Sequence, residues 1–268
     1  MQGRVLIVAG SDSGGGAGIQ ADLKTVTALG AFGATAITAL TAQNTRGVLG
    51  VFPIPPDFIA QQMDVVLEDI GADAIKTGML HSAAVIAAVA SSYERNARGV
   101  PLVVDPVMVA KGGASLLLPE ARKALVTRLL PLATLITPNL PEAEVLTGQT
   151  IRSVDGMRRA AAKLLTMGPT AVLVKGGHLE GPCVVDVLLT HAGEHSFEDD
   201  RILSTSTHGT GCTLASAIAA GIAQGLDLAA ATERARKYVR QAILHAPGLG
   251  HGHGPLNHAV TVVPMLDS

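Results

Sequence analysis

The chain has few aromatic residues and no tryptophan. Only four phenylalanines and two tyrosines occur among 268 residues, an aromatic fraction of 2%. A core must therefore be built from the aliphatic side chains that dominate the 48% hydrophobic content. An aliphatic, glycine-rich composition is typical of parallel strands that helices bury on both faces. The length fits one α/β domain, which we expect to span residues 1–268.

Net charge and cysteine are also scarce. A net charge of −2 and the lack of a basic run leave no electrostatic footprint for nucleic acid. No uninterrupted apolar run approaches 18 residues, so we expect no membrane span. The segment 1–4 ahead of the first expected strand is too short for a secretory signal. Two cysteines, Cys183 and Cys212, make no disulfide framework, which favours a reducing, cytoplasmic location.

Short apolar runs alternate with segments of helical periodicity along the whole chain. This β-α-β-α order predicts a mostly parallel sheet with helices on both faces, a three-layer α/β/α sandwich. No Pro/Gly/Ser-rich linker or repeat divides it. We expect strands at 4–9, 35–40, 74–77, 102–105, 135–137, 171–175 and 183–189, and helices from Asp57 and at 83–91, 120–130 and 155–167.

The most informative stretch is His-Gly-Thr-Gly-Cys at 208–212, which precedes a small-residue apolar run at 214–222. Gly209 and Gly211 allow a sharp turn, and the run predicts a buried helix. Inward N–H groups backed by a helix N-terminus make a cradle for an anion. We expect such a cradle to lower the pKa of Cys212. The alternative is a plain glycine turn with a buried cysteine.

A glycine-rich loop at 10–18 follows the first expected strand and fails two nucleotide-binding tests. It lacks the lysine of a P-loop. It contains a G-x-G-x-x-A match at 16–21, but Ala-Gln-Asn at 42–44 stands where a dinucleotide fold needs an acidic ribose partner. What remains is a bare backbone that a ligand can approach closely, or a long flexible turn.

Polar residues recur where strands are expected to end, the usual ligand position in such sheets. Gln43 offers a planar donor and acceptor suited to the edge of an aminopyrimidine or similar heterocycle, or is an exposed loop residue. Asp105 is a metal or phosphate-shell candidate, or a turn residue before proline. Asn139 and Glu142 form a helix capping box, which is compatible with holding hydrated Mg²⁺. Lys175 reaches a phosphate or extends to solvent.

Histidines at 251, 253 and 258 lie near the C-terminus. Their spacing relative to the two cysteines matches no zinc motif, so we interpret the segment as a tight terminal loop.

Several blocks together resemble hydroxymethylpyrimidine/phosphomethylpyrimidine kinases of the ribokinase-like superfamily. They follow the family's order over nearly the whole chain. One departure is Asp-Ser-Gly at 12–14, where the family commonly has Pro-Ser after the aspartate, a change that removes a rigid turn residue. The blocks are 10–12 with 14–24, 38–45, 105–108, 136–144, 175–178, 208–214 and 250–255.

The resemblance implies an enzyme that uses ATP and Mg²⁺ to phosphorylate 4-amino-5-hydroxymethyl-2-methylpyrimidine, first to the monophosphate and then to the diphosphate, in thiamine synthesis. It implies a homodimer as well. By the same resemblance, Gln43 recognises the aminopyrimidine edge, and Gly10, Ala17, Asp22, Met79 and Val107 line the same pocket.

The resemblance also implies the phosphate-transfer residues. Asn139 and Glu142 match an N-x-x-E motif that organises hydrated Mg²⁺, with Glu142 acting through water. Asp105 and Lys175 face the triphosphate. Gly209, Thr210 and Gly211 form the anion hole, and Cys212 stands where most of the superfamily carries a catalytic aspartate.

Two other functions stay open at this point. A pyridoxal or pyridoxine kinase acts on a ring of similar size that also carries a hydroxymethyl group. A non-catalytic pyrimidine-binding sensor would need none of the triphosphate machinery, so the presence of Asn139, Glu142, Lys175 and the cradle argues against it.

Overall fold

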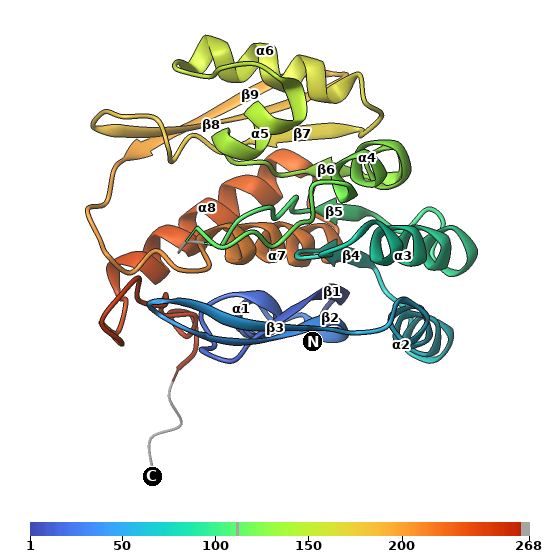
Figure 1. Cartoon of the computed structure of the whole chain (residues 1–268). Coiled ribbons are helices and arrows are strands. Elements are labelled where there is room, and N and C mark those ends of the chain that lie inside the picture. Colours follow the sequence, from blue (N-terminus) through green and yellow to red (C-terminus); the bar gives the residue numbers. More distant parts are fainter. Residues whose placement is uncertain (111–112, 264–268) are drawn as a thin grey trace.

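A computed structural model describes residues 1–110 and 113–263. Within these residues nine strands form one sheet in the order β3-β2-β1-β4-β5-β6-β7-β8-β9 (Figure 1). The strands are β1 (Arg4–Asp12), β2 (Phe32–Asn44), β3 (Gly47–Pro53), β4 (Ala74–Thr77), β5 (Leu102–Val104), β6 (Leu135–Ile136), β7 (Ala171–Val174), β8 (Cys183–Thr190) and β9 (Gly193–Asp200).

The sheet is mostly parallel, as predicted. Strands β2, β1, β4, β5, β6 and β7 pair in parallel, while β3, β8 and β9 add antiparallel edges. All seven predicted strands are present. Strands β3 and β9 were not predicted; every residue of β9 is exposed or half-buried, so its sequence carries no apolar strand pattern.

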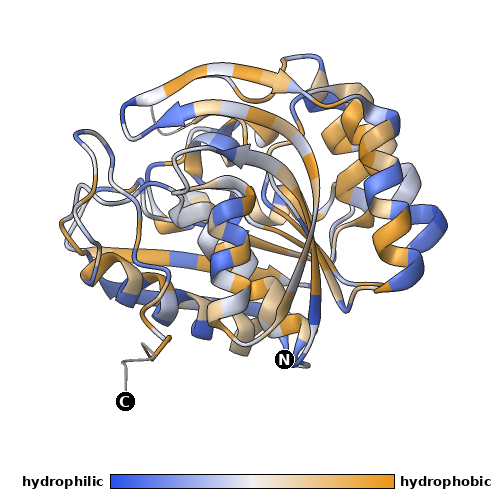
Figure 2. Ribbon diagram, turned by 90° about the horizontal axis from the view of Figure 1, so that it is seen from below, coloured by the Kyte–Doolittle hydropathy of each residue, from blue (hydrophilic) through white to orange (hydrophobic). Residues whose placement is uncertain are grey.

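Helices cover both faces of the sheet, which confirms the three-layer sandwich. One aliphatic cluster joins the sheet to α2–α6, and a second joins its other face to α1, α7 and α8. Figure 2 shows the apolar strands between these two helical layers. The helices are α1 (Gly18–Ala28), α2 (Pro56–Asp69), α3 (Ala83–Asn96), α4 (Ala121–Ala124), α5 (Leu140–Thr147), α6 (Val154–Leu165), α7 (Thr210–Ala223) and α8 (Leu228–Leu244).

The helix predicted at 120–130 is irregular. Helix α4 passes into a π-helical turn at Leu125–Leu129 and then a 3-10 turn at Leu130–Leu132. Pro131 contributes no N–H, so a regular α-helix cannot continue through it. No helix within 1–110 or 113–263 is both long and apolar enough to cross a membrane.

The histidine-rich terminal segment is a tight loop, as predicted. Its backbone closes on Thr45: the N–H of His253 donates to the Thr45 carbonyl at 2.8 Å, and the N–H groups of His251 and Gly252 donate to its hydroxyl at 3.2 Å. No cluster of three metal-ligating His, Cys, Asp or Glu side chains occurs among the described residues.

Candidate active site at the carboxyl ends of the strands

The parallel strands end at one edge of the sheet, and their C-terminal residues meet there. Asp105 follows β5, and Asn139 and Lys175 follow β6 and β7, where they form a parallel bridge. Lys175 Nζ lies 3.0 Å from Asp105 Oδ1, and the two side chains are only 13% and 3% exposed. The structure therefore brings these predicted residues together.

Helix α7 points its N-terminus at this edge. Gly209, its N-cap, has φ +81°, and a Cβ there would overlap the carbonyl oxygen of Gly16. Only glycine fits both demands. Amides of the first helical turn have no partner within the helix. Those of Gly211 and Cys212 are available for an anion, whereas that of Thr210 makes only a long 3.5 Å contact with the Thr207 carbonyl. A Cβ on Gly211 would lie 3.2 Å from Lys175 Nζ, which places the ammonium group against the cradle.

The capping box at α5 is present as predicted. The N–H of Glu142 donates to Asn139 Oδ1 at 2.9 Å, and the N–H of Asn139 donates to Glu142 Oε2 at 2.8 Å. Burial raises the pKa of Glu142 to about 7, an effect that Lys175 opposes and the Asp105 carboxylate reinforces. The carboxylates of Asp105 and Glu142 therefore both lie close to Lys175, in surroundings that are largely shielded from water.

Cys212 corrects a prediction. The cradle was expected to lower its pKa, but burial raises the pKa of the thiol to about 11. Lys76 and an N–H of Gly18 favour the thiolate, whereas the carboxylates of Asp22 and Asp105 disfavour it. Desolvation outweighs these favourable contacts with Lys76 and Gly18, so Cys212 is a neutral thiol at pH 7.

Beneath the cradle lies a buried charge pair that the sequence did not reveal. Lys76 Nζ contacts both carboxylate oxygens of Asp22 at 2.8 Å, and both side chains are fully buried. The hydroxyl of Ser216 in α7 donates to the same carboxylate at 2.7 Å. The carboxylate of Asp22 is thus engaged by protein groups, and its predicted place in the lining of the substrate pocket stays a prediction. The sequence feature that could have indicated this pair is Lys76, a single lysine in a short, otherwise mostly apolar strand.

A small apolar cluster lies beside the glycine loop. Met79, Ala39 and Leu116 are buried, with Val107 packed against them. A Cβ on Gly10 would lie 3.0 Å from Met79 Sδ, so Gly10, Met79 and Val107 share one region. Ala17 is the N-cap of α1, and a Cβ on Gly209 would lie 3.2 Å from its Cα, which puts Ala17 between this region and the cradle. Their contact with a substrate stays a prediction.

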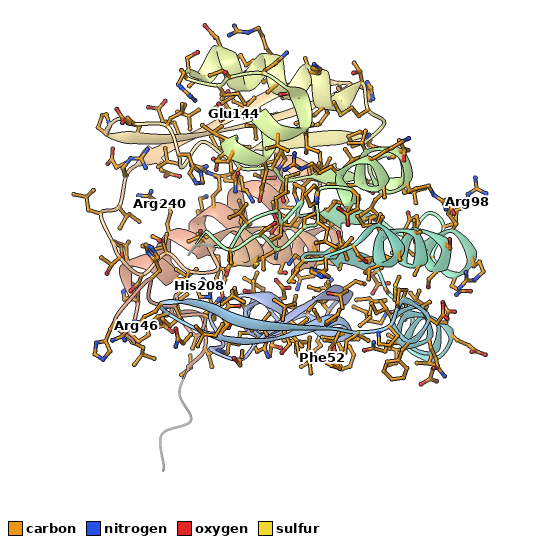
Figure 3. The ribbon with its side chains drawn as sticks, in the orientation of Figure 1. Arg46, Phe52, Arg98, Glu144, His208 and Arg240 are labelled. Carbon is orange, nitrogen blue, oxygen red and sulfur yellow. The ribbon has the colours of Figure 1, made fainter. Side chains whose placement is uncertain are left out.

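Gln43 joins this region through two residues that the sequence analysis missed. His208 Nε2 lies 2.8 Å from Asp12 Oδ2 and 3.3 Å from Gln43 Nε2. In Figure 3 the label of His208 lies between strand β2 and the helices α7 and α8. The Asp12 carboxylate also accepts N–H groups of Gly14, Gly16 and Ala17, so it orders the glycine loop despite the missing proline.

Comparison with known proteins identifies the family. Residues 12–257 match the model of the phosphomethylpyrimidine kinase family. A hydroxymethylpyrimidine/phosphomethylpyrimidine kinase of Streptomyces coelicolor is 49% identical, with 95% of this chain and 93% of that protein covered. The thiamine biosynthesis bifunctional protein ThiED of Geobacter sulfurreducens is 55% identical over 99% of this chain, which spans 54% of that longer protein.

A solved structure also matches closely. An ADP complex of a Bacillus subtilis pyridoxal kinase superposes with a TM-score of 0.89 at 38% identity, covering 97% of this chain and 98% of the other. The fold is therefore shared by kinases with different named substrates. The family match and the sequence relatives decide the assignment: the chain belongs to the phosphomethylpyrimidine kinase family.

Proposed function

We propose that the protein transfers the γ-phosphoryl group of ATP to 4-amino-5-hydroxymethyl-2-methylpyrimidine and then to the resulting monophosphate, in thiamine biosynthesis. The observation that carries this proposal is the convergence of the α7 cradle, Lys175 and Asp105 at one edge of the sheet, beside Gln43. The substrate ring is inferred from the protein's membership of the phosphomethylpyrimidine kinase family.

In the first step the hydroxymethyl oxygen attacks the γ-phosphorus, and the bond from phosphorus to the ADP oxygen breaks. Phosphoryl transfer depends mainly on positioning and on stabilising charge on the transferred group. Lys175 and the α7 amides of Thr210 and Gly211 supply that stabilisation. The attacking hydroxyl gives up a proton, and we propose that Cys212 takes it as the thiolate, after the thiol's own proton has passed to solvent.

The residues present fit Mg²⁺. Asp105 and Glu142 provide hard carboxylate oxygens close to Lys175. Mg²⁺ in kinases is commonly held by one or two carboxylates together with phosphates and water. We propose that these two residues hold it, with Glu142 acting through water and Asn139 fixing the position of Glu142. Bound Mg²⁺ would neutralise charge on the phosphates.

The role of Cys212 is tested by comparing the two half-reactions. Because its thiol has a pKa of about 11, it takes a proton only after losing its own. The second acceptor is a phosphate oxygen that needs little deprotonation. We therefore expect Cys212→Ala to slow the first phosphorylation about 10²-fold and the second much less, with Cys212→Asp recovering the first. An equal, negligible loss in both would exclude Cys212 as the base.

Pyridoxal phosphorylation is the second candidate function, favoured by the B. subtilis structure. Parallel measurement of ADP formation with the pyrimidine and with pyridoxal separates the two. We expect the larger kcat/KM with the pyrimidine. Binding of the pyrimidine in a calorimeter without any ADP formation would instead indicate a sensor.

We also propose a single domain, a homodimer and a cytoplasmic location. One continuous sheet through the described residues supports the single domain. The unpaired Cys183 and Cys212 suit a reducing compartment. The edge strand β3 supports the dimer, because Leu49 and Phe52 are 83% and 67% exposed there.

A further inference from the structure

Four side chains beside the cradle form one hydrogen-bonded cluster: Asp12, Thr41, Gln43 and His208. Asp12, Thr41 and His208 are buried, and Gln43 is half-buried. The Gln43 amide is placed with Nε2 3.3 Å from His208 Nε2 and Oε1 3.0 Å from Thr41 Oγ1. The donors and acceptors around it determine whether that orientation can hold.

The proton on His208 is fixed by Asp12. Burial alone would raise the pKa of Asp12, but hydrogen bonds from His208, Gly14 and Ala17 outweigh burial and lower it. The carboxylate is therefore ionised and can only accept. Since His208 Nε2 lies 2.8 Å from Asp12 Oδ2, that nitrogen must carry a proton, whether the ring is neutral or charged. A protonated ring nitrogen has no lone pair, so toward Gln43 it cannot accept and can only share the N–H that it donates to Asp12.

The proton on Thr41 is fixed in the same way. Thr41 Oγ1 lies 2.9 Å from the carbonyl oxygen of Ser11, which can only accept. A hydroxyl has one proton, and here it is donated to Ser11. Toward Gln43, Thr41 therefore presents only lone pairs.

We infer that the Gln43 amide is turned so that its oxygen accepts from His208 and its NH₂ group donates to Thr41. In the opposite orientation the Gln43 NH₂ group faces the N–H of His208 at 3.3 Å, and Gln43 Oε1 faces the lone pairs of Thr41 Oγ1 at 3.0 Å. Both contacts are repulsive. The two ends of an amide have nearly the same shape, so the hydrogen-bond network decides between them. His208 and Thr41 are thus positioning residues that act through Gln43.

This orientation of the Gln43 amide determines which way round a ring binds, a consequence that rests on the proposed function. One lone pair on Oε1 and one N–H on Nε2 of Gln43 remain for a ligand. An aminopyrimidine presents an amino N–H next to an unprotonated ring nitrogen. That pair matches the amide in one direction only, so a fixed amide fixes how the ring enters. Pyridoxal lacks this amino and ring-nitrogen pair, so the network favours the aminopyrimidine.

The amide orientation is measured directly by NMR on the ligand-free full chain. The Gln43 side-chain signals are identified by their loss in Gln43→Glu. We expect the Nε2 protons to give stronger nuclear Overhauser effects to Thr41 than to the His208 ring. Stronger effects to the ring than to Thr41 would overturn the inference. This readout does not depend on which substrate the enzyme uses.

The positioning role is measured by kinetics. In His208→Leu and Thr41→Val we expect the KM for the pyrimidine to rise about tenfold through the lost hydrogen bond, with a much smaller change in the KM for ATP. His208→Gln and Thr41→Ser, which keep a donor and an acceptor, should recover most of the loss. Parallel changes in both KM values, or no recovery, would overturn the positioning role. A wild-type enzyme inactive on the pyrimidine would overturn the proposed function instead, leaving the NMR to decide the amide.

Discussion

Glu142 is the titratable residue whose environment leads most directly to a measurable effect. Its pKa of about 7 means that the carboxyl is largely neutral below pH 7 and ionised above it. A divalent cation favours the ionised form. Because one pH unit below the pKa leaves about a tenth of the groups ionised, we expect the apparent affinity for Mg²⁺-ATP to rise about tenfold from pH 6 to pH 8.

Glu142→Gln should abolish this rise and hold the affinity at its low-pH level. Glu144→Gln is the matched control on the same helix. The hydrogen bond from the N–H of Ile151, together with the nearby Arg152, outweighs desolvation and keeps the pKa of Glu144 below its usual value. It stays ionised throughout, and its loss should leave the pH curve unchanged. A wild-type curve that is flat between pH 6 and pH 8 would exclude a Glu142 contribution.

Lys76 provides a stability prediction. Lys76→Met leaves the Asp22 carboxylate buried without its partner, so we expect the free energy of unfolding to fall by about 3–5 kcal/mol. The same substitution at Lys237, whose ion pair with Glu233 is exposed, should cost less than about 1 kcal/mol. Urea denaturation gives both values.

Removing both charges distinguishes the cost of an unpaired Asp22 carboxylate from the cost of losing the Lys76 side chain itself. In Lys76→Met/Asp22→Leu no unpaired charge remains, so we expect much of the lost stability to return. A double variant as unstable as the sum of the two single variants would show that the two residues act independently.

At the scale of elements, the start of α7 depends on Gly209. Gly209→Ala forces a positive φ on an L-residue and also requires the Gly16 carbonyl to move. A displacement of the cradle on the order of 1 Å is expected to lower kcat about 10²-fold. Gly225→Ala is the matched control, since Gly225 has φ +88° but open space around its Cβ position. It should lose about 1–2 kcal/mol of stability through strain alone, with kcat unchanged. Equal kcat values in the two variants would contradict the cradle's role.

Most elements could be predicted from sequence because the pattern of their apolar side chains indicates which residues are buried. Strands β5 and β7 are continuous apolar runs, and the Asn139–Glu142 spacing predicts the capping box at α5. The failures have physical causes too. Strand β9 is exposed and polar. The high pKa of Cys212 arises from desolvation and from Asp22 and Asp105, which lie far away along the chain. The importance of His208 comes from its contact with Asp12, 196 positions apart in sequence.

At the scale of the whole molecule, the two edges of the sheet differ sharply. Strand β9 is lined by exposed charged residues, which discourage pairing with another chain, whereas β3 exposes apolar side chains along an open edge. Figure 3 labels Phe52 near the margin of the molecule formed by β3. A second copy covering β3 would remove this apolar surface from water.

We therefore expect light scattering to give twice the chain mass of 27.3 kDa for the wild type. Leu49→Lys/Phe52→Lys should shift the protein to the mass of one chain. His195→Lys, on β9, should not. A monomeric wild type, or a double variant that stays dimeric, would exclude β3 as the interface.

The central claim is that this site phosphorylates the aminopyrimidine twice. Mass spectrometry of the products, with the wild-type chain, the pyrimidine and Mg²⁺-ATP, tests it most directly. We predict that the monophosphate appears first and is then converted to the diphosphate, with one ADP formed per phosphoryl group transferred. A pyrimidine that stays unphosphorylated, while pyridoxal supplied in its place is converted to its phosphate, would contradict the account.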